Sequence, residues 1–277
     1  HRDHRSHHLR LWKSTAAGRK GTRQRAFFGL GKRIEQHECR QKSRSSLWNI
    51  GDFNYLCNIY STTYDMENNT LKRDFASKLL RIKAIKLQPN EPFTWASGWK
   101  SPFYCDNRKT LSYPDIRTFV KVGMVHAILK HFPEADVIAG VATAGIPQAA
   151  LIADVLNMPL IYVRSKPKDH GLENLIEGEM KEGAKVVVIE DLISTGGSSL
   201  KAVEAIRKAG GDVVGMVASY TYGFPVAAQA FSDANVKLVT LTDYDHVVAE
   251  ALATGYIQES DTELLNEWRK NPSNWRK

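Results

Sequence analysis

The stretch Val186-Val-Val-Ile-Glu-Asp-Leu-Ile-Ser-Thr-Gly-Gly-Ser-Ser199 decides the fold. Its first four residues are apolar and mostly β-branched, which predicts a strand that is buried on both faces. The small residues at 194–199 predict a turn that leads directly into a helix ending near Ala209, where two glycines follow. A strand, a tight turn and a helix in succession are the repeating unit of a parallel α/β sheet.

The same alternation continues on both sides of this stretch. Further strands are predicted at 137–141, 160–163, 213–220 and 237–241, and further helices at 71–87 (capped by Thr70), 114–132, 145–157 and 243–254. We therefore predict an α/β fold with a central parallel sheet flanked by helices. The segment 88–106 holds three prolines and five aromatic residues, so we expect loops and short strands there, forming a small N-terminal hood.

The excess positive charge of the chain lies in its first quarter. Residues 1–65 carry 13 Lys+Arg and 5 Asp+Glu, whereas 66–277 carry 25 of each and show no bias toward a nucleic-acid partner. Since all five methionines lie at or after Met66, we interpret 1–65 as a non-native or disordered leader; a basic tail or a targeting peptide is the alternative. One domain is then expected over 66–277, with a hood at about 66–110 plus the C-terminal part and a core at about 111–245.

The cysteine and hydropathy patterns favour a reduced, cytoplasmic protein. The chain has three cysteines and no CxxC spacing, so neither a zinc site nor a disulfide framework is indicated. No run of 18 or more apolar residues occurs, and we therefore expect no transmembrane helix and no membrane partner.

The residues after the strand at 186–189 combine anion-binding and acidic chemistry. A small-residue turn before a helix exposes backbone N–H groups to an anion, and Ser194, Thr195 and Ser198 add hydroxyl donors. Glu190 and Asp191 would repel a phosphate, so we expect them to accept hydrogen bonds from sugar hydroxyls or to stabilise a positive charge developing on a sugar. One carboxylate about 5 Å from such a charge contributes roughly 3 kcal/mol at an effective dielectric constant of about 20.

The whole run resembles the phosphoribosyl-diphosphate signature of the type I phosphoribosyltransferases. The resemblance implies that fold, with Glu190 and Asp191 on the ribose hydroxyls and Asp191 active in catalysis. It implies a 5′-phosphate site formed by Leu192, Ile193, Ser194, Thr195, Gly196, Gly197 and Ser198. The small-residue turn at 140–147 resembles the family's diphosphate loop and implies a role for Thr143 and Ala144; an ordinary tight turn is the alternative.

The cation-rich segment 164–171 resembles the mobile catalytic loop of the orotate phosphoribosyltransferases. Arg164, Lys168 and His170 match the positions that contact the diphosphate in that family, and Lys168 and His170 are implied to be catalytic. Cations here would neutralise the departing diphosphate, and His170 would donate a proton or a hydrogen bond to it. In the family this loop often closes over the site of the neighbouring subunit, which implies a homodimer. A solvated surface loop is the alternative.

The predicted hood segment also resembles that of the orotate enzymes. Phe103 and Tyr104 would stack on a planar pyrimidine, although both rings could instead belong to the hood core. Ser194 and backbone N–H groups are the expected donors for the carboxylate of orotate. Ala96 and Tyr222 stand where some members carry a lysine and an arginine, so this chain is expected to bind orotate with fewer charged contacts.

The resemblance implies a transferase of de novo pyrimidine biosynthesis. It would join orotate to 5-phospho-α-D-ribose 1-diphosphate, giving orotidine 5′-phosphate and diphosphate. Magnesium is implied as the cofactor, bridging substrate oxygens with no direct protein cage. Two alternatives remain: a purine phosphoribosyltransferase, and a non-catalytic regulator of the same fold that binds nucleotides and RNA. The hood and the 164–171 segment favour the orotate enzyme.

Overall fold

The computed structural model describes residues 69–94, 98, 100–166 and 175–276, all within a single compact unit. The predicted leader at 1–65 lies outside these residues, as do Ala96, Lys168 and His170. At the centre is a six-stranded sheet in the order β10-β9-β8-β5-β6-β7. Its strands are β5 (Val137–Val141), β6 (Leu160–Val163), β7 (Ile176–Glu177), β8 (Lys185–Ile193), β9 (Asp212–Thr221) and β10 (Leu238–Asp243).

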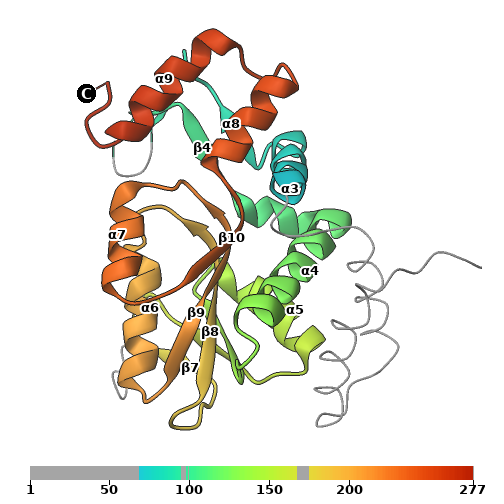
Figure 1. The fold of residues 1–277 in the computed structure, drawn as a ribbon, viewed down its shortest axis with the longest axis vertical. Helices are drawn as coiled ribbons and strands as arrows, with labels where there is room; N and C mark the ends of the chain where they lie inside the picture. Colours follow the sequence, from blue (N-terminus) through green and yellow to red (C-terminus); the bar gives the residue numbers. More distant parts are fainter. Residues whose placement is uncertain (1–68, 95–97, 99, 167–174, 277) are drawn as a thin grey trace, which may run out of the picture. The chain divides into compact units, whose positions relative to one another are not determined.

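Helices cover both faces of this sheet, which confirms the predicted α/β fold (Figure 1). One face is covered by α4 (Pro114–His131) and α5 (Gly145–Leu156), the other by α6 (Gly197–Lys208) and α7 (Pro225–Asp233). Five strands run parallel, and only the short edge strand β7 is antiparallel, to β6. The strands are apolar because a parallel sheet covered by helices exposes neither face to water.

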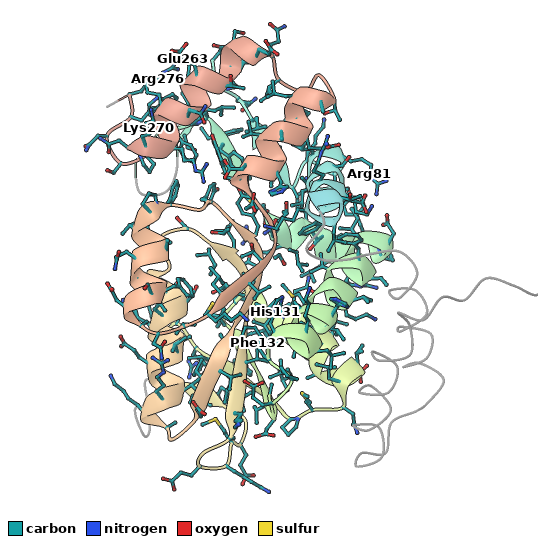
Figure 2. The ribbon with its side chains drawn as sticks, in the orientation of Figure 1. Arg81, His131, Phe132, Glu263, Lys270 and Arg276 are labelled. Atoms are coloured by element: carbon teal, nitrogen blue, oxygen red, sulfur yellow. The ribbon has the colours of Figure 1, made fainter. Side chains whose placement is uncertain are left out.

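Close packing between α4 and the sheet depends on one glycine. A side-chain carbon at Gly215 of β9 would lie 2.1 Å from the ring of Phe132, the residue after α4. Figure 2 shows Phe132 and its neighbour His131 at that end of the helix. The pairing of β8 with β9 shifts register between Val186 and Val187, the residue that pairs with Gly215.

A second layer lies beyond the carboxyl ends of the strands. It contains α3 (Asn69–Arg81), the strands β1 (Ile85–Leu87) and β4 (Phe103–Cys105), the hairpin β2 (Phe93–Thr94) and β3 (Lys100–Ser101), the short helix η1 (Asn107–Ser112), and the C-terminal helices α8 (Tyr244–Ala253) and α9 (Glu259–Lys270). Lys72 of α3 forms an ion pair of 2.9 Å with Asp243, which also accepts from the His246 backbone N–H at the start of α8. The two ends of the domain sequence therefore meet in one layer.

Aromatic rings fill the interior of this layer. The ring of Phe103 lies between 5.2 and 6.2 Å, centroid to centroid, from four others. This hood aromatic cluster consists of Phe103, Tyr220, Tyr222, Tyr244 and Trp268, all buried. Because its members come from β4, β9, α8 and α9, the cluster joins the hood to the end of the central sheet.

Several local predictions were wrong. The first helix ends at Arg81 rather than near residue 87, and Thr70 lies within it rather than capping it. Strand β1 follows at Ile85–Leu87, where pairing with β4 replaces the helical turn. Helices α7 and α9 and the edge strand β7 were not predicted; α7 and β7 are short, whereas α9 is amphipathic and begins with a capping box, so its signal was overlooked.

Candidate active site

The sequence had suggested that the acidic pair follows the strand. In the structure the pair lies within the last part of β8. Backbone pairing with β9 continues to Ile193. Within this stretch Glu190 pairs with Ala218, and Leu192 pairs with Tyr220. Glu190 is only 6% exposed. Its carboxylate accepts hydrogen bonds of 3.0 Å from the Asp191 backbone N–H and from the Ser199 hydroxyl on α6.

The protonation of this pair follows from its burial. Burial, and then the charge of Asp191, raise the pKa of Glu190 to about 8. Burial also raises the pKa of Asp191, although hydrogen bonds from Glu190 and from backbone amides oppose the rise. Burial thus favours the protonated form of the ligand-free pair, most strongly at Glu190. Hydroxyl donors or a positive charge placed beside the pair would favour its fully ionised form.

The turn after β8 opens an anion site at the start of α6. No side chain caps this helix, whose N-cap residue is Gly196 with a φ of +83°. A side-chain carbon at Gly196 would lie 2.8 Å from the ring of Phe231, so the turn requires glycine for both conformation and space. Thr195, Gly197 and Ser198 are exposed at this helix start. Uncapped N–H groups and the helix dipole make the turn suitable for a phosphate.

A second turn of the same kind follows the adjacent strand β5. It contains Thr143 and Ala144, joins Ala142 to Thr143 through a cis peptide bond, and leads into α5, which also has no side-chain cap. A side-chain carbon at Gly145 would lie 2.5 Å from the carbonyl oxygen of Ile189. The start of α5 is thereby pressed against β8 one residue before the acidic pair. The structure brings both predicted anion turns to the same pair of carboxylates.

The helix η1 connects the hood to this site. Asn107 is buried, and its side-chain amide donates a 2.8 Å hydrogen bond to the backbone carbonyl of Asp191. The same side chain accepts from the thiol of Cys105 at 3.3 Å. The next residue, Arg108, forms a 2.6 Å ion pair with Asp106. Sequence reasoning missed both Asn107 and Arg108; the contact of Asn107 spans 84 positions, whereas the ion pair of Arg108 is local.

The two predicted base-stacking residues differ in their surroundings. Phe103 is completely buried in the hood aromatic cluster, which favours the hood-core role that the sequence left open. Tyr104 is 37% exposed, and its ring lies 5.5 Å from that of Phe93. Of the two rings, Tyr104 is the one that a ligand can reach.

The predicted cation-rich segment begins at the end of β6. Its backbone is held there by a 2.8 Å hydrogen bond from the Arg164 N–H to the Leu175 carbonyl. The Arg164 side chain lies 3.5 Å from the carboxylate of Glu177 on β7.

The described residues contain no group of three or more His, Cys, Asp or Glu side chains that could hold a metal ion. Two adjacent carboxylates are nevertheless sufficient for Mg²⁺, which usually binds one or two carboxylates together with substrate phosphates. In the same part of the chain, no helix has the length and apolar character that spanning a membrane requires.

An acidic pair between two anion turns at the carboxyl ends of adjacent parallel strands defines a phosphoribosyltransferase. The model of the phosphoribosyl transferase domain matches residues 125–253, which include both turns. The orotate phosphoribosyltransferase of Bacteroides fragilis is 70% identical over 205 residues, covering 74% of this chain and 97% of the relative. The chain belongs to the orotate phosphoribosyltransferase family.

Further relatives carry the same name. The orotate phosphoribosyltransferase of Porphyromonas gingivalis is 66% identical over 206 residues, covering 74% of this chain and 98% of the relative. The crystal structure of orotate phosphoribosyltransferase from Aeropyrum pernix is similar in fold, with a TM-score of 0.58 and 27% identity. That likeness covers 66% of this chain and 99% of the solved one.

Proposed function

We propose that this protein transfers the phosphoribosyl group of 5-phospho-α-D-ribose 1-diphosphate to orotate, in the de novo synthesis of pyrimidine nucleotides. The products are orotidine 5′-phosphate and diphosphate. The observation that carries the proposal is the acidic pair of buried Glu190 and half-buried Asp191 between two uncapped helix starts. This arrangement suits a ligand with two phosphate groups separated by a sugar. The assignment of orotate as the nucleobase rests on membership of the orotate phosphoribosyltransferase family.

The donor substrate is divided among four sets of residues in this proposal. The turn after β8 binds the 5′-phosphate through Leu192, Ile193, Ser194, Thr195, Gly196, Gly197 and Ser198. Glu190 and Asp191 accept hydrogen bonds from the ribose hydroxyls. Thr143 and Ala144 bind the diphosphate through backbone groups. Arg164, Lys168 and His170 contact the same diphosphate, and Lys168 and His170 neutralise it as it departs.

The transfer forms a bond from C1 of the sugar to a ring nitrogen of orotate and breaks the bond from C1 to the diphosphate oxygen. The hydrogen on that nitrogen leaves as a proton, which the departing diphosphate can accept. Positive charge develops on the sugar between these events. Asp191 stabilises this charge by roughly 3 kcal/mol if its carboxylate lies about 5 Å away at an effective dielectric constant of about 20. That energy corresponds to a rate factor of about one hundred. No protein nucleophile is needed, and C1 is inverted.

Orotate binds on the hood side of the acidic pair. Tyr104 stacks on the pyrimidine ring, and Phe103 packs in the hood aromatic cluster on the opposite face of β4. Ser194 and neighbouring backbone N–H groups donate hydrogen bonds to the base. The exposure of Tyr104 and the burial of Phe103 support this division of roles.

Magnesium is the proposed cofactor, and it would be held through oxygens of the substrates rather than by a cage of protein side chains. When bound, it neutralises charge on the diphosphate and so makes that group a better leaving group. We further propose that the enzyme is a cytoplasmic homodimer in which segment 164–171 serves the partner's site.

One assay tests the proposed reaction. The purified chain is mixed with orotate, the activated sugar and Mg²⁺, and the loss of the orotate ultraviolet band is followed, with guanine and adenine in parallel reactions. We expect turnover of orotate alone. Turnover of a purine in place of orotate would contradict the base assignment. Failure with every base, together with RNA binding, would favour a regulator.

A further inference from the structure

The base side of the site lacks an obvious partner for an anion. Orotate carries a carboxylate, yet the described residues around its proposed position include three acids, Asp106, Glu190 and Asp191. An uncompensated anion beside them would bind weakly. The sequence offers no cation at Ala96 or Tyr222. The inference below concerns the group that binds the orotate carboxylate, and it rests on the proposed function.

Arg108 lies where such a group is needed. It is the second residue of η1, directly after the hood strand that carries Tyr104. The preceding residue, Asn107, fixes the start of η1 to the backbone carbonyl of Asp191 at 2.8 Å. Arg108 therefore connects the base side of the site to the sugar side.

The guanidinium of Arg108 is hydrogen-bonded through Nε, whereas its two terminal nitrogens form no hydrogen bond among the residues that the structure describes. Its Nε donates to Asp106 at 2.6 Å, and this is its only side-chain hydrogen bond within the described part of the chain. The side chain is 65% exposed. An arginine has five N–H donors, so the outer fork retains four that can bind a carboxylate in a bidentate manner.

The carboxylates near Arg108 favour its charged form. The hydrogen bond to Asp106 and the charge of that carboxylate raise the pKa of the guanidinium, and the charges of Tyr104 and Asp191 act in the same direction. Arg108 in turn opposes the rise in the pKa of Asp191 that burial causes.

Two other arginines near the site have other assignments. Arg164 is assigned to the diphosphate, and its side chain lies 3.5 Å from the carboxylate of Glu177. Arg269 of α9 reaches the backbone of Gly223, beside Tyr222, but both of its terminal nitrogens donate to Asp245.

We propose that Arg108 binds the carboxylate of orotate and gives the enzyme its preference for orotate over a pyrimidine without that group. The planar guanidinium matches a carboxylate in shape as well as charge, whereas the ammonium of a lysine matches charge alone. Asp106 orients Arg108 for this contact through the ion pair at Nε. Arg108 takes over the role of the cations that some relatives carry at the positions of Ala96 and Tyr222.

The test measures recognition of the carboxylate itself. Dissociation constants for orotidine 5′-phosphate and for uridine 5′-phosphate, which differ only by that carboxylate, are measured by calorimetry on the full chain. The proteins are the wild type, Arg108→Gln, Arg108→Lys and the control Arg81→Gln. Arg81 is matched in exposure at 62% and in its ion pair with a carboxylate, and it lies on α3 (Figure 2).

We expect Arg108→Gln to reduce the preference for orotidine 5′-phosphate by about 10- to 100-fold, the usual range for a charged hydrogen bond. Its affinity for uridine 5′-phosphate should change less than about threefold. Arg108→Lys should restore part of the preference, and Arg81→Gln should leave it unchanged. The KM for orotate should rise in Arg108→Gln while the KM for the sugar diphosphate stays constant.

Three results would overturn the assignment. Equal weakening of both nucleotides would mean that Arg108 binds a shared group or supports the fold. A rise in the KM of the sugar diphosphate alone would move Arg108 to the leaving group. Lys86 pairs with Tyr104 across β1 and β4. If Lys86→Gln lost the preference for orotidine 5′-phosphate and Arg108→Gln kept it, Lys86 would be the residue that binds the carboxylate. Failure of the wild type to consume orotate would instead contradict the proposed function.

Discussion

Replacing Glu190 with glutamine is expected to stabilise the ligand-free protein at alkaline pH and to remove most of its activity. Glutamine has nearly the same shape as glutamate and retains a carbonyl that accepts from the Asp191 N–H. Its amide can donate to the Ser199 hydroxyl, which now donates to Glu190 but can also accept. The substitution therefore removes a buried charge and leaves the local hydrogen bonds in place.

The size of the effect follows from the pKa of Glu190. Burial, and then the charge of Asp191, raise this pKa from 4.5 to about 8. At about 1.36 kcal/mol for each pKa unit, the shift corresponds to a ceiling of about 5 kcal/mol. Because the two acids titrate together, we expect about 2 to 5 kcal/mol.

The direction of the pH dependence follows from the same shift. The folded pKa lies above the unfolded one, so the contribution of Glu190 to stability is fully present below about pH 4.5. It is lost as the pH rises to about 8, where the folded protein also ionises. Glutamine does not titrate and avoids this loss. The stability difference between variant and wild type should therefore grow with pH and level off above about 8.

Urea denaturation at pH 5 and pH 8.5, at one fixed protein concentration, measures this difference. We expect less than about 1 kcal/mol at pH 5 and about 2 to 5 kcal/mol at pH 8.5, in favour of the variant. The control Glu204→Gln removes an exposed carboxylate from α6 and should stay within about 0.5 kcal/mol of the wild type. A variant no more stable than the wild type at pH 8.5, or a difference independent of pH, would refute the reasoning.

Three further outcomes are expected. Asn107→Ala removes the amide that bonds the Asp191 carbonyl, and should lower the free energy of unfolding by about 1 to 3 kcal/mol in urea titrations and raise the KM for the sugar diphosphate. Gly145→Ala places a carbon 2.5 Å from a backbone oxygen and should lower the melting temperature, whereas Gly197→Ala, with nothing within 4 Å, should not. Deletion of 1–65 should leave kcat for orotate unchanged; a truncated protein that folds but lacks activity would contradict the leader interpretation.

Strand and turn positions could be predicted where the signal is local. The apolar runs of β5 and β6 are bounded by turn residues, and both strands have the predicted bounds. The end of β8 could not be predicted, because Glu190 and Asp191 interrupt the apolar pattern while the backbone continues to pair with β9. Strand length there depends on the partner strand, which the local sequence does not reveal.

The same distinction applies to the site. The two anion turns were predicted because small residues before a helix are a local signal. The role of Asn107 was not, since its hydrogen bond crosses 84 positions in the sequence to Asp191. Burial of Phe103 but not Tyr104 also depends on distant partners, among them Trp268 from the last helix.

The construction of the hood predicts how the two substrates respond to distant changes. The proposed donor site is built from the turns after β5 and β8, whereas β4, the strand that carries Tyr104, packs through Phe103 against Trp268 of α9 at 6.2 Å. The base side therefore depends on packing against α9, whereas the two turns of the donor side lie at the carboxyl ends of the core strands. Loosening the packing of α9 should therefore weaken orotate binding before it weakens binding of the sugar diphosphate.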